Sequence, residues 1–177
     1  MTIFKNTTKS NESWTLLLMR HGKSDWSSKI DKDFDRVLAS RGISDAPMMG
    51  NWIKTNQYLP DQIICSPAMR TKQTVEYVCK QIDMPVNDVC WDKRIYGADI
   101  SNLLDILSNA NYKAKTLLMV GHNPGFSDLV NYLCSGNGSI GKSMPTAAIA
   151  VIALNKFWPE IKQHSGTLLH FVTPKQV

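Results

Sequence analysis

Two histidines and two arginines are the residues of this sequence whose types and positions are best suited to chemistry. Arg20 and His21 are adjacent, whereas Arg70 and His122 lie far along the chain. A guanidinium is a permanently charged fork whose geometry matches the oxygens of a phosphoryl group. An imidazole can attack phosphorus through one ring nitrogen when a hydrogen bond holds the other, and a second imidazole can donate to a phosphoryl oxygen. These residue types indicate phosphoryl transfer through a phosphohistidine intermediate, and the set needs no metal ion or cofactor.

Each histidine follows a short apolar run that has the length of a buried strand. Residues 15–19 form the first run and end in Arg20 and His21. Residues 116–120 repeat the pattern shortly before His122. An apolar run of this length, followed abruptly by polar residues, is typical of a strand in the interior of an α/β sheet. Both histidines are therefore expected just beyond the carboxyl ends of strands.

Arg70 is placed by a third strand and the helix that follows it. The strand is expected at residues 62–65, with Ser66 as the N-cap of the helix and Pro67 at its first position. Arg70 then lies about one turn into the helix, close to the end of the strand. Because open α/β sheets bind ligands beyond the carboxyl ends of their strands, we expect the two arginines and two histidines to converge in one crevice.

The remaining sequence alternates strands with amphipathic helices. Further strands are expected at residues 86–91, 147–154 and 167–172, and helices from residue 44 onward, at 100–107 and at 126–133. This alternation predicts a three-layer α/β/α sandwich with a mostly parallel central sheet. The 177 residues divide into a polar N-terminal extension, residues 1–13, and a single domain, residues 14–177.

Charge and composition exclude several classes of protein. The net charge of +5 comes from scattered lysines and arginines, without the basic stripe interleaved with aromatic residues that nucleic-acid binders use. We therefore expect no nucleic-acid partner, although a positive field suits phosphorylated substrates. No apolar run approaches the roughly 18 residues that span a membrane, and no secretory signal precedes the domain. The four cysteines lack zinc-binding spacing, which favours reduced thiols in a cytoplasmic protein without a metal site.

A glycine-rich segment at residues 136–143 matches the P-loop pattern G-x-x-x-x-G-K-S. A P-loop that binds nucleotide follows a buried strand and opens a helix. This segment instead follows a predicted helix and precedes Met-Pro-Thr and a strand. We therefore predict no nucleotide site there.

Three segments resemble the signature segments of the histidine phosphatase superfamily, in their usual order. They are LMRHG at residues 18–22, SPAMRTKQT at 66–74 and GHNP at 121–124. Four further segments are similar to the small bacterial phosphohistidine phosphatase branch: KSDW at 23–26, DFDR at 33–36, YGA at 96–98 and MPT at 144–146. The resemblance covers nearly the whole chain after residue 13 and implies a phosphoglycerate mutase-like fold.

By this resemblance, His21 is the nucleophile that is phosphorylated during turnover, and Arg20, Arg70 and His122 hold the phosphoryl group. The substrate-binding residues that it implies are Gly22, Lys23, Arg94, Asn123 and Thr146. The implied activity is metal-independent hydrolysis of phosphohistidine in a phosphorylated protein, or of a related small phosphorylated substrate. The short chain lacks the large insertions of the mutase branch, which favours a minimal hydrolase with an open site.

One position departs from the family pattern. Many members carry a glutamate as general acid three residues before the tyrosine of the Tyr-Gly turn, and Lys93 stands there in this sequence. The candidate replacements are Asp25 and Asp35 in the loop after the first strand, and Asp92, although an extended segment turns Asp92 to the opposite side. Cleavage of the labile P–N bond of phosphohistidine needs less acid catalysis than expulsion of an alkoxide. The departure therefore favours phosphohistidine over phosphomonoesters.

Two alternatives remain open from the sequence. One is a phosphomonoesterase that acts on a small metabolite, which the absent glutamate disfavours. The other is a non-catalytic phosphate-binding module in a phosphorelay, which the presence of all four arginines and histidines disfavours.

Overall fold

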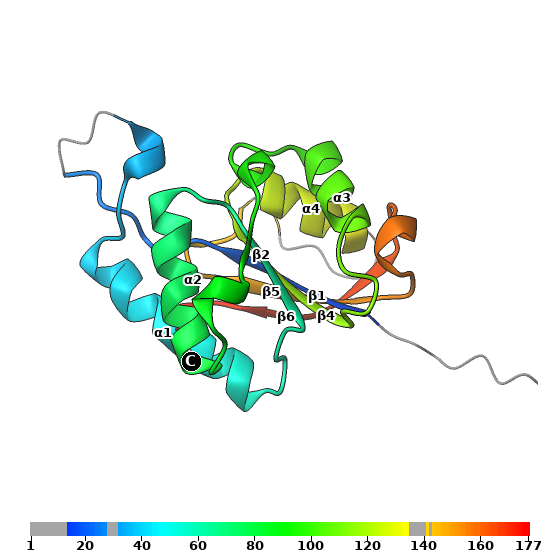
Figure 1. Cartoon of the computed structure of the whole chain (residues 1–177), viewed down its shortest axis with the longest axis horizontal. Coiled ribbons are helices and arrows are strands. Elements are labelled where there is room, and N and C mark those ends of the chain that lie inside the picture. The colour runs from blue at the N-terminus through cyan, green and yellow to red at the C-terminus, as the bar shows by residue number, and fades with distance from the viewer. Residues whose placement is uncertain (1–13, 28–31, 135–140, 142) are drawn as a thin grey trace, which may run out of the picture.

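The computed structural model describes residues 14–27, 32–134, 141 and 143–177. The predicted extension, residues 1–13, and most of the P-loop-like segment lie outside these residues. The described residues form one six-stranded sheet and four α-helices (Figure 1). The strands are β1 (Trp14–Arg20), β2 (Gln62–Cys65), β3 (Cys90–Trp91), β4 (Thr116–Gly121), β5 (Ile149–Leu154) and β6 (Gly166–Val172). The helices are α1 (Ser40–Thr55), α2 (Met69–Gln81), α3 (Ile100–Ser108) and α4 (Gly125–Cys134). Short 3-10 helices are η1 (Asp33–Asp35), η2 (Val86–Asp88), η3 (Lys93–Ile95), η4 (Trp158–Glu160) and η5 (Pro174–Gln176).

The strand order in the sheet is β3-β2-β4-β1-β5-β6. The neighbours β3, β2, β4 and β1 are parallel, whereas β5 runs antiparallel to β1 and β6 antiparallel to β5. The predicted mostly parallel sheet is confirmed. Because β4 lies between β1 and β2, the carboxyl ends of the three strands that precede the candidate residues meet at one edge of the sheet.

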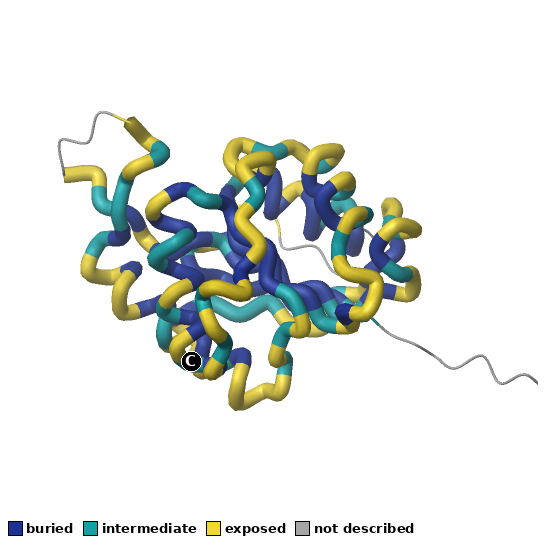
Figure 2. Tube along the Cα trace, in the orientation of Figure 1, coloured by how far each residue is buried: buried dark blue, intermediate teal, exposed yellow. Residues whose placement is uncertain are grey.

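Helices cover both faces of the sheet, with α1 and α2 on one face and α3 and α4 on the other (Figure 1). The side chains of β1 alternate between the two cores. Leu17 and Met19 pack with α1 and α2, whereas Leu16 and Leu18 pack with α3 and α4. A strand that is buried on both faces is apolar at every position, which explains the unbroken run in the sequence. Figure 2 shows the buried sheet between helices whose outer surfaces are exposed, which confirms the three-layer sandwich.

Two predicted elements differ in extent from the structure. The strand expected at 86–91 is reduced to β3, because the chain after Pro85 turns into η2, where the amide of Asp88 donates to the carbonyl of Pro85 (3.1 Å). Both residues of β3 are exposed at the edge of the sheet. Helix α1 begins at Ser40, earlier than the expected residue 44, since the amide of Ile43 already donates to the carbonyl of Ala39 (3.0 Å).

Helix α1 touches the backbone of the segment that follows β1. A Cβ atom built on Gly42 would overlap the carbonyl oxygen of Lys23 and lie 2.9 Å from its amide nitrogen. The same carbonyl accepts a hydrogen bond from the amide of Ala39 (2.8 Å). A residue without a Cβ is therefore required for α1 to hold this segment in place.

We expect Gly42→Ala to destabilise the protein despite the higher helix propensity of alanine. Overpacking against backbone atoms costs about 1–3 kcal/mol, whereas the gain in helix propensity is about 1 kcal/mol. Chemical denaturation of the variant and of the wild type measures the difference. Ser40→Ala, at an exposed position of the same helix, is the control. Equal unfolding midpoints for Gly42→Ala and Ser40→Ala would contradict the close contact.

Candidate active site

His21 lies directly after β1, and its ring is fixed by one hydrogen bond. Nδ1 is 2.7 Å from the carbonyl oxygen of Gly22. A carbonyl can only accept, so Nδ1 carries the proton and Nε2 carries the lone pair. The amide of Gly22 donates in turn to Thr74 Oγ1 on α2 (3.0 Å). The carbonyl that orients the imidazole is therefore held in place by the neighbouring helix.

Arg70 extends from the first turn of α2 to His21. Its Nε donates to His21 Nε2 (3.3 Å), and the side chain of Arg70 is only 6% exposed. The predicted helix start at Ser66 and Pro67 is wrong, because α2 begins at Met69. The amide of Ser66 still bonds to the carbonyl of Val120 on β4 (3.1 Å), which extends the ladder of β2 by one residue. Arg70 therefore lies nearer the helix start than the sequence indicated.

His122 follows β4 and lies beside His21. The centroids of the two rings are 5.2 Å apart. His122 Nε2 is 2.8 Å from Ser66 Oγ, and the ring of Tyr96 packs edge-on at 5.4 Å. His122 Nδ1 is buried and has no hydrogen-bond partner among the described residues. A buried polar nitrogen without a partner is costly, which indicates a position that a ligand would satisfy.

Arg20 completes the group from the last position of β1. Its Nη1 donates to the carbonyl of Met144 (2.6 Å), which also accepts from Asn123 Nδ2 (3.0 Å). The Nε of Arg20 is buried and, in the part of the chain that is described, has no partner. The structure thus brings the two arginines and two histidines together at the predicted edge of the sheet.

The electrostatics of this group keep both imidazoles neutral. Burial, together with the positive charges of Arg70 and Arg20, lowers the pKa of His21 to about 4, against the opposing effect of the hydrogen bond to Gly22. Burial and the adjacent His21 lower the pKa of His122 to about 3. The pKa of Arg20 is lowered by burial and by Arg70. A neutral imidazole keeps its lone pair at neutral pH, and the guanidiniums supply the positive charge that an anionic phosphoryl group requires.

Comparisons with known proteins agree with this geometry. Residues 16–89 match the model of the histidine phosphatase superfamily (branch 1). An uncharacterized protein of Mycobacterium tuberculosis is 33% identical over 164 residues, which cover 89% of this chain and 100% of that protein. The chain belongs to the histidine phosphatase superfamily.

Some of the proteins that resemble this chain have names that state an activity. Phosphohistidine phosphatase SixA of Escherichia coli is 27% identical over 144 residues, covering 80% of this chain and 86% of that protein. Among solved structures, a SixA homologue from Nakamurella multipartitia has a TM-score of 0.81 and 25% identity, and covers 92% of this chain and 96% of its own. The protein histidine phosphatase SixA complexed with tungstate has a TM-score of 0.77 and 24% identity, covering 91% and 97%. This histidine phosphatase therefore has the phosphoglycerate mutase-like fold that its sequence predicted.

The structure adds Asp33 to the residues of this histidine phosphatase site. Its Oδ2 accepts from Arg70 Nη2 (3.0 Å) and from the hydroxyl of Tyr96 (2.8 Å), and its backbone carbonyl accepts from Arg70 Nη1 (2.7 Å). Its Oδ1 pairs with Arg36 Nη2 (2.7 Å), and the guanidinium of Arg36 stacks on the ring of Trp26 at 3.5 Å. The sequence alone did not indicate that Asp33, Arg36 and Tyr96 belong to the site. Its one indication was that these three residues fall in segments similar to the phosphohistidine phosphatase branch.

The implied substrate-binding residues do not all lie at the site. Gly22 contacts His21 directly, whereas Asn123 donates to the Met144 carbonyl that also accepts from Arg20. The backbone of Lys23 follows Gly22, and its side chain is exposed. Thr146 lies in the turn between Met144, which bonds to Arg20, and Ala147. The amide of Ala147 donates to the carbonyl of His21. Arg94 is the exception.

Two carboxylates bind Arg94. Its guanidinium pairs with Asp92 (2.6 Å) and with Asp105 on α3 (2.5 Å). Among the described residues, every hydrogen bond of the guanidinium goes to one of these two carboxylates. The expectation that Arg94 binds substrate is not supported by its place in the structure, because its charge is already neutralised.

None of the three carboxylates considered as general acids bonds to Arg20, His21, Arg70 or His122 in the described part of the chain. Asp25 accepts hydrogen bonds from the amide and hydroxyl of Ser27, and these bonds lower its pKa. Asp92 is bound by Arg94, a hydrogen bond that lowers its pKa as well. Asp35 is exposed on η1, with no side-chain hydrogen bond or ion pair to another described residue. Hydrogen bonds that stabilise the carboxylate form make a poor proton donor.

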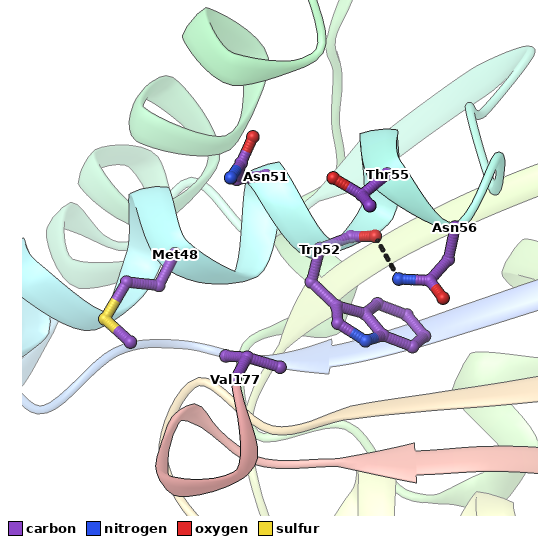
Figure 3. A pocket seen from close by; sticks show the side chains of 6 residues that line it. All are labelled: Met48, Asn51, Trp52, Thr55, Asn56 and Val177. Atoms are coloured by element: carbon purple, nitrogen blue, oxygen red, sulfur yellow. Dashed lines mark hydrogen bonds between the residues drawn. The ribbon is translucent and has the colours of Figure 1, made fainter.

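Other features of the described residues are separate from this site. No group of three His, Cys, Asp or Glu side chains there is placed to hold a metal ion, and no helix there is both long and apolar enough to cross a membrane. A hollow of about 250 Å³ lies between α1 and the C-terminus (Figure 3). It is lined by Met48, Asn51, Trp52, Thr55, Asn56 and Val177. None of these residues belongs to the histidine phosphatase site.

The low pKa values give a prediction for titration. We expect the ring signals of His21 and His122, followed by NMR, to remain those of neutral imidazoles down to about pH 5 and to titrate with midpoints of about 4 and about 3. His21→Gln and His122→Gln variants assign the signals. Because the unfolded chain binds protons near pH 6.5, the free energy of unfolding falls as the pH drops from 6.5 toward 4. A midpoint between 6 and 7 for either ring would contradict the buried, positively charged environment.

Proposed function

We propose that this histidine phosphatase hydrolyses phosphohistidine, in a phosphorylated protein or a related small substrate, through a covalent phospho-His21 intermediate and without a metal ion. The observation that carries the proposal is the orientation of His21. Its Nδ1 is bound to the carbonyl of Gly22, and its Nε2 faces Arg70. The neutral, oriented imidazole beside a guanidinium is what nucleophilic attack on phosphorus requires.

Arg20, Arg70 and His122 hold the phosphoryl group in this mechanism. The guanidiniums take its oxygens and balance the charge spread over them in the transition state. The partner-free nitrogens of Arg20 and His122 support this assignment. Arg20 Nε is a buried donor, and His122 Nδ1 is also a donor when Ser66 Oγ donates to Nε2, so a phosphoryl oxygen would accept from both. In the structure Arg70 donates to the lone pair of His21 Nε2. The incoming phosphoryl oxygens replace that contact and free the lone pair for attack.

The chemical step forms a bond between His21 Nε2 and phosphorus while the bond from phosphorus to the leaving nitrogen breaks. The electron pair of the broken bond stays on the leaving imidazole. A water molecule then attacks the phosphorus of phospho-His21, inorganic phosphate departs, and the imidazole is regenerated. No metal-bound water is part of either step.

The choice of phosphohistidine rests on the leaving group. Lys93 stands where a glutamate acid occurs in many members, and Asp25 and Asp92 are held as carboxylates by hydrogen bonds from Ser27 and Arg94. An imidazole leaves more readily than an alkoxide without a protonated carboxyl group. The similarity to the phosphohistidine phosphatase SixA of Escherichia coli supports the same choice. We also place the protein in the cytoplasm, because its four cysteines are free, as in a reducing compartment.

The test is hydrolysis of a phosphohistidine peptide and of p-nitrophenyl phosphate in the presence of EDTA. We expect activity on both substrates, with His21→Ala lowering kcat by at least about a thousandfold, because only binding and electrostatic effects would remain. Because the P–N bond of phosphohistidine is hydrolysed in acid and survives in alkali, an alkaline quench of the reaction should trap phosphate on His21 of the wild type.

His164→Asn serves as the matched control. His164 is exposed and has a φ of 61°, a left-handed conformation that asparagine tolerates. This variant should keep wild-type activity. Loss of activity in EDTA, or His21→Ala with more than a tenth of wild-type kcat, would refute the metal-independent phospho-His21 mechanism. Binding of phosphate without turnover would instead indicate a phosphate-binding module.

A further inference from the structure

One ionisable side chain at the candidate site has no part in the mechanism above. Asp33 lies on η1, and its side chain is 48% exposed, whereas that of its partner Arg70 is 6% exposed. Its carboxylate is linked to Arg70, Arg36 and the hydroxyl of Tyr96. The ring of Tyr96 packs against His122. The carboxylate therefore lies on the solvent side of the buried arginine.

This carboxylate is held in its ionised form. Burial acts in the opposite direction, but the hydrogen bond from Tyr96 and the charges of Arg70 and Arg36 outweigh it and lower the pKa of Asp33. The pKa of Tyr96 is raised, chiefly by the same hydrogen bond. An ionised carboxylate has no proton to give to an alkoxide, so Asp33 in this state cannot replace the missing glutamate for a phosphomonoester.

An ionised carboxylate is, however, the correct partner for the leaving group of phosphohistidine. The phosphorylated imidazole has a second ring nitrogen, and when that nitrogen carries a proton the ring departs as a neutral molecule. A carboxylate that accepts a hydrogen bond from this N–H favours the protonated form. Acid assistance is then provided at the distal nitrogen, and no proton transfer to the leaving nitrogen is needed.

We propose that Asp33 determines leaving-group specificity by accepting a hydrogen bond from the distal ring N–H of the phosphohistidine substrate. The proposal rests on the proposed function of the site. As His21 Nε2 bonds to phosphorus, the P–N bond breaks and its electron pair remains on the leaving nitrogen. The proton stays on the distal nitrogen, so a neutral imidazole leaves and the Asp33 carboxylate is unchanged.

An alternative role for the Asp33 carboxylate would give different kinetic results. If Asp33 only neutralises Arg70 and Arg36 until a phosphoryl group displaces it, removing its charge improves the use of every phosphorylated substrate. If it recognises the imidazole, removing its charge harms phosphohistidine alone. The two roles therefore separate when substrates with different leaving groups are compared.

The experiment measures kcat/KM of Asp33→Asn on a phosphohistidine peptide and on p-nitrophenyl phosphate, whose leaving group needs no proton. We expect kcat/KM to fall between about tenfold and a hundredfold on the peptide, the range for loss of a charge-assisted hydrogen bond. On p-nitrophenyl phosphate we expect a rise of severalfold, because one negative charge leaves the site. Asp35→Asn, which removes the same charge from the same 3-10 helix, should change neither value by more than about twofold.

Two further measurements distinguish a specific effect of Asp33→Asn from misfolding of this variant. Asp33→Asn should bind inorganic phosphate more tightly than the wild type, which an unfolded protein cannot do. Tyr96→Phe keeps the ring that packs on His122 and removes only the hydroxyl that orients Asp33, so it should shift the substrate ratio in the same direction by a smaller factor.

Changes of Asp33→Asn in the same direction on both substrates, or an unchanged ratio, would overturn the role of Asp33 while leaving the proposed function intact. A wild-type protein that hydrolyses p-nitrophenyl phosphate but not the phosphohistidine peptide would overturn the proposed substrate, and the role of Asp33 with it.

Discussion

The parallel register between β1 and β4 is the constraint on which the site depends. Arg20 pairs with Gly121, and the amide of His21 donates to the carbonyl of Gly121 (3.0 Å). The residues that follow each strand, His21 and His122, therefore lie side by side. A slip of one residue would turn every side chain of β1 to the opposite core. Leu16 and Leu17, which pack in different cores, are both fully buried. The packing of both faces thus fixes the spacing of the two imidazoles.

The same burial determines the charge state of the site. Two imidazoles enclosed with two guanidiniums have their pKa values lowered by desolvation and by the neighbouring positive charges. The protein does not need a carboxylate behind His21 to orient it, because the carbonyl of Gly22 performs that function. The result is a region with permanent positive charge and neutral nitrogen atoms. Such a region favours a phosphoryl dianion over water, and it keeps the candidate nucleophile unprotonated across the physiological range.

The elements that rest on local pattern could be predicted from the sequence. The apolar runs of β1, β2 and β4 indicated their positions, and the rule that ligands bind beyond strand ends brought Arg20, His21, Arg70 and His122 together. That the P-loop-like segment binds no nucleotide stays a prediction, because most of the segment lies outside the described residues.

The parts of the site that depend on long-range loop contacts could not be predicted in the same way. Asp33 bonds to Arg70, which is 37 positions away in the sequence, and to Tyr96, which is 63 positions away. The periodicity of apolar residues gives no information about such contacts. Serine is a residue type that often caps helices, but the hydroxyl of Ser66 contacts His122. Arg94 has the charge of a phosphate ligand, yet two nearby carboxylates neutralise it. In each case a tertiary contact competed successfully with the local preference.

The 3-10 helix that carries Asp33 buries none of its own residues. Substitutions in it therefore change little of the apolar packing on which the stability of the fold depends. The chemistry beside Arg70 can therefore be altered by substitution in this exposed turn at little cost to the free energy of unfolding of the domain.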